Sequence, residues 1–112
     1  MIDDLQPSHC KVKEPLEILL GKWTPVILLN LMHTSPMRFS EVKRAIPDIT
    51  QKMLTKQLRE LESQEIITRE VYPEVPPRVE YAITPYGRTL EPILDALHKW
   101  GIEHKKRLQS SH

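Results

Sequence analysis

The stretch RFSEVKRAIPDITQKMLTKQLRELES, residues 38–63, contains two helical patterns separated by a short break. In the first pattern, apolar residues recur at helical spacing up to Ile46, and Ser40 is placed to cap the amino end of the helix. Pro47 then prevents the helix from continuing. The second pattern begins after Thr50, a residue type that favours the N-cap position. This stretch therefore predicts two helices joined by a tight turn.

The second helix has one apolar face and one basic face. Leu54, Leu58 and Leu61 lie on the first face, and Lys52, Lys56 and Arg59 lie on the second. At about 100° per residue, the leucines fall within about 40° of Leu54 and the cations lie about 140 to 200° away. Lys52 also occupies the first turn, where the helix dipole disfavours a cation by up to about 1 kcal/mol unless an anion is near. A solvated helix face is one interpretation, and a face bound to DNA phosphates is the other.

The charge of the chain is unevenly distributed. Residues 38–59 contain six basic and two acidic residues, a local net charge of +4, whereas the whole chain carries +1, so the remainder carries −3. Such asymmetry within one small domain indicates an electrostatic binding surface on one side.

The segment after the second helix predicts a β-hairpin. Residues 66–72 and 78–83 are rich in β-branched and aromatic residues and show strand-like alternation. The connection between them, residues 73–77, contains three prolines, which stiffen the backbone and remove hydrogen-bond donors from a sheet edge. We expect a stiff hairpin with Arg78 as a strong cation near its tip, although the prolines could serve only to protect the edge.

Further helices are predicted at both ends of the chain. A short helix is expected over residues 14–20, and a second helix starts at Thr24-Pro25 and ends near His33. Thr84-Pro85 is predicted to open a final helix, kinked at Pro92. Its apolar stripe comprises Leu90, Ile93, Leu94, Leu97 and Trp100.

The order of these elements predicts an α+β fold, a winged helix-turn-helix. We expect a single domain over residues 1–112, in which residues 10–83 form the helices, the recognition helix and the wing, and residues 84–107 form a C-terminal dimerisation helix. The recognition helix corresponds to residues 50–63.

Three blocks of the sequence resemble a known family. GKWTPVILLNLM, RFSEVKRAIPDITQKMLTKQLRELE and VYPEVPPRVEYAITPYGRTLEPILDALHKWG are similar to the corresponding blocks of HxlR-type transcriptional regulators, relatives of the MarR-type regulators. The resemblance runs from about Cys10 to Gly101, and it departs from the usual pattern at Leu20, where a second glycine is common. It implies a homodimeric bacterial DNA-binding regulator without enzymatic activity or cofactor. It also favours pairing of the stripe of the final helix with its copy in a second subunit, and packing of the stripe against the first helix is the alternative.

Double-stranded DNA is the expected partner. Gln51, Lys52, Thr55 and Lys56 are suited to base edges in the major groove, and Arg59 is suited to a phosphate. Arg38, Ser40, Lys43 and Arg44 are expected to contact the DNA backbone, and Arg78 the adjacent minor groove. Two-fold pairing would place two recognition helices about 34 Å apart on an inverted-repeat operator.

The single cysteine, Cys10, is a candidate redox or electrophile sensor. It stands between His9 and two lysines, Lys11 and Lys13, and neighbouring cations lower the pKa of a thiol and raise its thiolate fraction. Some HxlR-type regulators use a cysteine near this position for sensing. A packing role is the alternative.

Other classes of function receive little support from the sequence. The chain lacks a Gly-rich phosphate loop and a recognisable catalytic triad, and its five histidines are scattered, so neither an enzyme nor a metal site is expected. No apolar run approaches the roughly 20 residues of a membrane span, so a cytoplasmic protein without membrane contact is expected. The remaining alternative is a winged-helix module that binds a protein or a small ligand. A small-molecule effector is not identifiable from the sequence.

Overall fold

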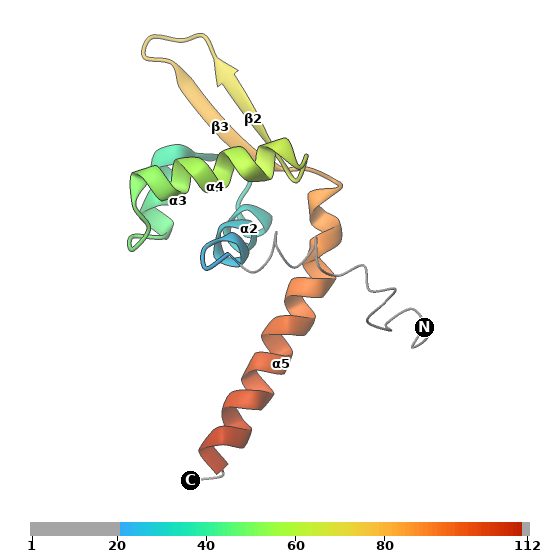
Figure 1. Cartoon of the computed structure of the whole chain (residues 1–112). Coiled ribbons are helices and arrows are strands. Elements are labelled where there is room, and N and C mark those ends of the chain that lie inside the picture. The colour runs from blue at the N-terminus through green and yellow to red at the C-terminus, as the bar shows by residue number, and fades with distance from the viewer. Residues whose placement is uncertain (1–20, 111–112) are drawn as a thin grey trace, which may run out of the picture.

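The computed structural model describes residues 21–110 of the chain (Figure 1). The predicted helix over residues 14–20 and Cys10 lie outside this range. In chain order the elements are α2 (Thr24–His33), β1 (Met37–Arg38), α3 (Phe39–Ala45), α4 (Gln51–Ser63), β2 (Ile67–Tyr72), β3 (Arg78–Ile83), the 3-10 turn η3 (Gly87–Leu90) and α5 (Glu91–Ser110). The helices and the small antiparallel sheet confirm the predicted winged helix-turn-helix fold.

Helix α2 lies at the centre of the hydrophobic core. Ile27, Leu28 and Leu31 are completely buried, and Trp23, just before the helix, packs against the core. Pro25 falls in the first turn, as predicted. Proline is tolerated there because backbone N–H groups in the first turn of a helix have no intrahelical acceptor. The hydroxyl of Thr24 donates to Oε1 of Gln57 at 3.0 Å, which ties the start of α2 to α4.

The predicted pair of helices is present as α3 and α4, but the cap of α3 differs from the prediction. We expected Ser40 to cap it, whereas the N-cap is Arg38 and Ser40 lies inside the first turn. The backbone N–H of Arg38 donates to Oε1 of Glu41 at 2.8 Å, so the carboxylate takes part in capping from within the helix. The helix ends at Ala45, and Pro47 follows two residues later.

Helix α4 confirms the predicted pattern. Oγ1 of Thr50 accepts from the N–H of Met53 at 3.1 Å, and the three leucines of the apolar face are buried. At its carboxyl end, Ile66 N–H donates to Leu61 O and Glu65 N–H to Glu62 O. This pair of hydrogen bonds is a Schellman motif, and it places Glu65 in the left-handed region with φ of 62°.

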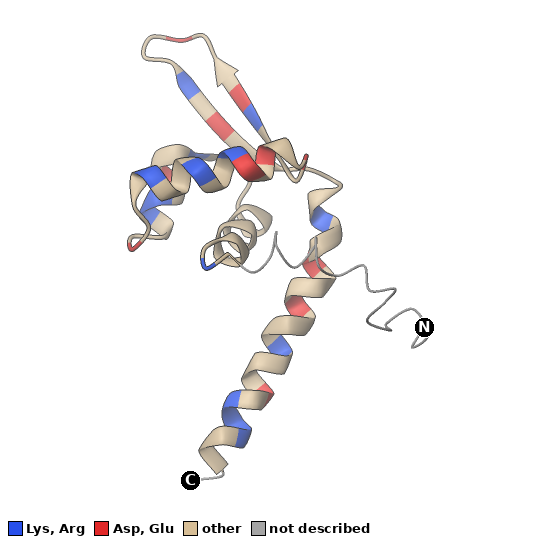
Figure 2. Cartoon of the chain, viewed as in Figure 1, with Lys and Arg blue, Asp and Glu red and all other residues tan. Residues whose placement is uncertain are grey.

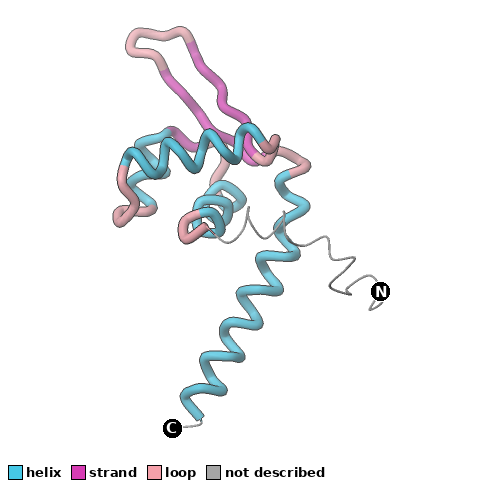
Figure 3. Tube along the Cα trace, viewed as in Figure 1, coloured by secondary structure: helices cyan, strands magenta, loops and turns pink. Residues whose placement is uncertain are grey.

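The sheet has the order β1-β3-β2, with both pairings antiparallel. β2 and β3 form the predicted hairpin, here called the wing, which rises beside α4 (Figures 1 and 3). The sequence did not predict β1, whose two residues pair with β3 as Met37 with Tyr81 and Arg38 with Glu80. A two-residue strand has too little alternation to be recognised.

The prediction for the start of the last helix was wrong. α5 begins at Glu91 rather than near Thr84, and Pro92 lies in its first turn, where a proline neither removes a needed donor nor kinks the helix. Thr84 instead anchors the preceding turn, because its Oγ1 accepts from Gly87 N–H at 2.8 Å and lies 3.0 Å from Ile66 O. From this turn α5 extends away from the rest of the fold as a single rod (Figure 1).

Candidate nucleic-acid interface

The outer face of α4 brings together all the base-contacting residues predicted from the sequence. A shallow groove of about 680 Å³ is lined by Gln51, Lys52, Thr55, Lys56, Arg59 and Glu60. Among residues 21–110, the cations of this groove have no ion-pair partner, although Glu60 lies at its margin. The hydroxyl of Thr55 donates to Gln51 O at 2.9 Å, so its methyl group remains for apolar contact. Figure 2 shows the basic residues as successive bands along α4.

The predicted backbone-contacting residues lie on and beside α3. Arg38, Ser40 and Arg44 are exposed. The Lys43 side chain is half-buried, and its Nζ donates to Pro47 O at 3.1 Å, where it closes the turn between α3 and α4. The structure therefore gives Lys43 a role in the turn that the sequence did not reveal.

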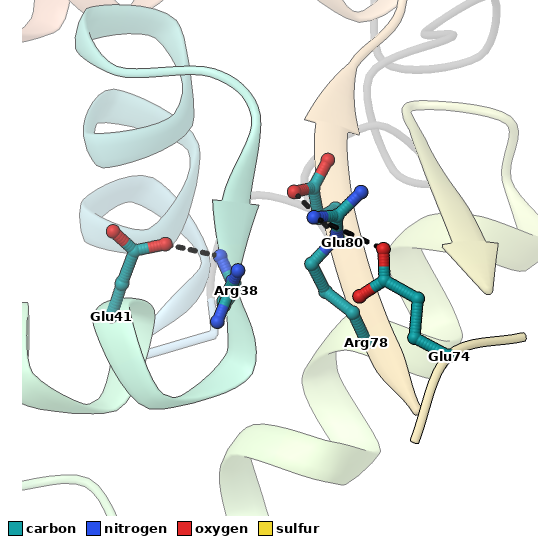
Figure 4. Close-up of polar contacts among 5 residues, drawn as sticks. All are labelled: Arg38, Glu41, Glu74, Arg78 and Glu80. Atoms are coloured by element: carbon teal, nitrogen blue, oxygen red, sulfur yellow. Dashed lines mark hydrogen bonds and ion pairs between the residues drawn. The ribbon is translucent and has the colours of Figure 1, made fainter. Parts of the chain in front are cut away.

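Arg78 is held by its neighbours rather than standing free at the wing tip. Its guanidinium lies 3.5 Å from Oε1 of Glu74 and 3.3 Å from Oε2 of Glu80 (Figure 4), and its Cζ lies 4.2 Å from the centroid of the Tyr72 ring. Two carboxylates thus surround one guanidinium. The expectation of a strong, uncompensated wing cation has to be corrected.

The wing contains a second arginine that the sequence analysis did not single out. Arg69 lies opposite Tyr81 in the β2–β3 register, on the face of the hairpin that looks toward α4. Arg78 lies on the other face, which also carries Glu80 and Arg38. Together residues 67–83 carry two arginines and three glutamates, a net charge of −1. The basic surface is therefore concentrated on α3 and α4.

The predicted dimerisation stripe separates into two parts in the structure. Leu94 is 3% exposed and Leu90 packs against the core, so these two residues attach α5 to its own subunit. Ile93, Leu97 and Trp100 are 52%, 54% and 62% exposed. The stripe continues beyond the predicted residues to Leu108, since residues 93, 97, 100, 104 and 108 share one helical face.

These features define the class of protein. A basic and polar helix is presented by a helix-turn-helix, with a β-hairpin beside it, which is the arrangement of a winged helix-turn-helix DNA-binding domain. Within residues 21–110, no helix is long and apolar enough to cross a membrane.

Comparison with known proteins identifies the family. The model of the HxlR-like helix-turn-helix family matches residues 18–109, so the chain belongs to this family. The chain is 55% identical over 100 residues to the HTH-type transcriptional regulator YtcD of Bacillus subtilis, a match that covers 89% of this chain and 79% of YtcD. The chain is thus a transcriptional regulator with a helix-turn-helix DNA-binding domain, as the resemblance implied.

Solved structures agree with this assignment. A crystal structure of a ytcD regulator superposes with a TM-score of 0.81 at 54% identity, covering 87% of this chain and 98% of that one. The redox regulator HypR in its reduced form superposes with a TM-score of 0.82 at 44% identity, covering 90% of this chain and 99% of that one. The winged helix and the long C-terminal helix are therefore arranged as in these relatives.

Proposed function

We propose that the protein is a homodimer that binds an inverted-repeat operator in the cytoplasm, with α4 of each subunit in the major groove. The observation that carries this proposal is the outer face of α4, where Gln51, Lys52, Thr55 and Lys56 line one groove. Lys52 sits in the first turn of α4, where the helix dipole is unfavourable to it until an external anion approaches. A phosphodiester group supplies that anion.

Within this arrangement, each group of residues has a distinct part. The amino-terminal half of α4 reads base edges, although its Lys52 also approaches a phosphate, and Arg59 and the cations of α3 hold phosphates. Arg78 reaches the adjacent minor groove from the wing tip, where narrow A·T-rich segments attract arginine. Arg78 has to give up its contacts with two carboxylates when it binds DNA. It therefore contributes less to the binding free energy than an arginine without such partners would.

The exposed half of α5 supports the dimer. Ile93, Leu97, Trp100 and Leu108 form an apolar stripe along a helix that projects from the domain. Trp100 stacks on His104 with ring centroids 4.8 Å apart, which extends the flat surface along the same face. The same stripe of a second subunit covers it, and two-fold symmetry then presents two α4 helices to one side of the duplex.

Cys10 is proposed as a redox or electrophile sensor. Its basic sequence neighbours favour the thiolate, and the similar protein HypR is named a redox regulator. The test is DNA release by diamide or a quinone in the wild-type protein and in Cys10→Ser. Release that persists unchanged in the variant refutes the sensor.

The experiment that tests the main proposal is a gel shift followed by footprinting. The probes are the DNA segments upstream of the protein's own gene and its neighbours, each with a scrambled duplex of equal length. We expect protection of two half-sites related by a two-fold axis and centred about one helical turn apart. Binding that does not distinguish these probes from scrambled duplexes contradicts the operator assignment.

A further inference from the structure

A cleft of about 420 Å³ separates α4 from the wing. The α4 side presents Gln51, Thr55 and Arg59, which stand four residues apart and so form one row along the helix, together with Glu62. The wing side presents Arg69, Val79 and Tyr81, and Phe39 completes the lining. The register of Arg69 with Tyr81 explains why the Arg69 side chain faces α4 rather than the other face of the hairpin.

The two arginines of this cleft are not neutralised. Arg59 and Arg69 are both exposed, and within the described part of the chain neither guanidinium takes part in an ion pair or a hydrogen bond. Glu62 is the acidic residue of the lining, and among the described residues its carboxylate forms no ion pair with either guanidinium. Arg78, on the other face of the wing, is instead held by Glu74 and Glu80. The cleft therefore carries the uncompensated cationic charge of the wing.

The geometry of duplex DNA determines what crosses this cleft in a complex. The major groove and the adjacent minor groove are separated by one sugar-phosphate strand. When α4 lies in the major groove and the wing lies at the adjacent minor groove, that strand has to pass between the helix and the hairpin. The row Gln51, Thr55 and Arg59 borders both this cleft and the groove on the outer face of α4, so the two surfaces are continuous.

We propose that the cleft between α4 and the wing holds the DNA backbone, and that Arg69 is a phosphate-contacting residue acting opposite Arg59. This inference rests on the proposed operator binding and adds a specific role for a residue of β2. The guanidinium groups approach the strand from its two sides, and each offers paired N–H donors to phosphate oxygens. Such contacts fix the position of the protein on the duplex without reading the base sequence.

The test compares Arg69→Gln with a matched control, Arg88→Gln, which removes an exposed arginine of η3 that does not line the cleft. Affinity is measured by fluorescence anisotropy over a salt series, for the footprinted operator and for a scrambled duplex. We expect the slope of log affinity against log salt to become shallower by about 0.9 in Arg69→Gln. When the salt concentration rises fourfold, the factor by which affinity falls should then be about threefold smaller in the variant than in the wild type. Operator and scrambled duplex are expected to weaken by the same factor. Arg88→Gln is expected to keep the wild-type slope.

Two further variants separate charge from folding. Arg69→Lys retains the cation and is expected to keep the wild-type slope, whereas Glu62→Gln removes the acid of the cleft and is expected to bind both duplexes severalfold more tightly at equal salt. Thermal melts confirm that each variant is folded. An Arg69→Gln slope equal to that of the wild type, or a Glu62→Gln affinity no higher, overturns the role of the cleft. If the wild-type protein binds the operator no more tightly than the scrambled duplex, the proposed operator binding is wrong, whatever the variants show.

Discussion

Nε of Arg78 lies 3.3 Å from Oε2 of Glu80, two residues along the same strand (Figure 4), and the guanidinium also lies over the ring of Tyr72. The side chain of the wing arginine is therefore positioned before DNA arrives. Glu80 is also the register partner of Arg38, the residue of β1 that caps α3, so the strand that holds Arg78 is hydrogen-bonded to the start of the helix-turn-helix.

Replacing Arg78 with alanine is expected to weaken operator binding while leaving the fold intact, because the side chain, although only 29% exposed, lies on the hairpin and outside the hydrophobic core. Arg78→Lys keeps the charge but loses the planar stacking on Tyr72, so an intermediate affinity is expected. Binding titrations and thermal melts of the two variants provide the check. Wild-type affinity in Arg78→Ala would rule out a role of the wing arginine in DNA binding.

The first turn of α4 offers a test in which stability and binding change in opposite directions. Lys52→Gln removes a cation from the positive end of the helix dipole, so the unfolding free energy of the unbound protein should rise by about 0.3 to 1 kcal/mol. The same change should weaken DNA binding and flatten its salt dependence by about 0.9 if a phosphate contact is lost. Urea denaturation and anisotropy titrations measure the two effects. Lys99→Gln, which breaks an exposed pair with Asp95 on α5, is the control and should leave DNA binding unchanged.

The two halves of the α5 stripe are expected to respond differently to substitution. Leu97→Glu places a charge on the exposed half and should dissociate the dimer while each subunit stays folded, since Leu97 is 54% exposed. Leu94→Ala removes a buried side chain and should lower the unfolding free energy by about 2 to 5 kcal/mol, because it leaves a cavity in the subunit core. Sedimentation and chemical denaturation separate the outcomes. A monomeric wild type at micromolar concentration would contradict the assigned interface.

Glu65 is a position at which a substitution should stabilise the protein. Its φ of 62° is a conformation that glycine adopts without a Cβ penalty, and Glu65 is exposed at the end of α4. We expect Glu65→Gly to raise the unfolding free energy by about 0.5 to 1 kcal/mol. Glu60→Gly, within the regular part of the same helix, should instead lower it by a similar amount. Equal effects of the two substitutions in thermal melts would show that the backbone conformation is not the cause.

Gly87 is expected to tolerate no side chain. A Cβ at this position would overlap the carbonyl oxygen of Ile66 and lie 2.8 Å from Cδ1 of Ile83. Gly87→Ala should therefore cost roughly 1 to 3 kcal/mol of unfolding free energy, because backbone must shift to relieve the overlap. Gly101→Ala is the matched control, since a Cβ there meets no atom within 4 Å and alanine favours a helix. Similar stability of the two variants in urea denaturation would contradict the close approach at Gly87.

Patterns that repeat along the chain were sufficient to predict most of the fold. The 3.6-residue period of Leu54, Leu58 and Leu61 predicted the buried face of α4, and Thr50 predicted its start, because both depend on neighbours within one or two helical turns. Strand alternation predicted the hairpin to within one residue, since β2 starts at Ile67 and β3 ends at Ile83. These interactions are local, and residue type at fixed spacing determines them.

The sequence by itself thus determined the helices, the hairpin and the basic face of α4, whereas tertiary structure decided which cations are available. Arg78 was predicted to be a strong cation near the wing tip and Arg69 was not singled out, yet folding places two glutamates around Arg78 and turns Arg69 toward Arg59 across the cleft. The division of the α5 stripe into a buried Leu94 and an exposed Leu97 likewise depends on where the helix leaves the core. The physical reason is that charge compensation and burial depend on how the folded elements lie against one another. Glu74 and Glu80, four and two residues from Arg78, reach its guanidinium only in the folded hairpin, and Arg69 faces Arg59 only because the wing stands beside α4.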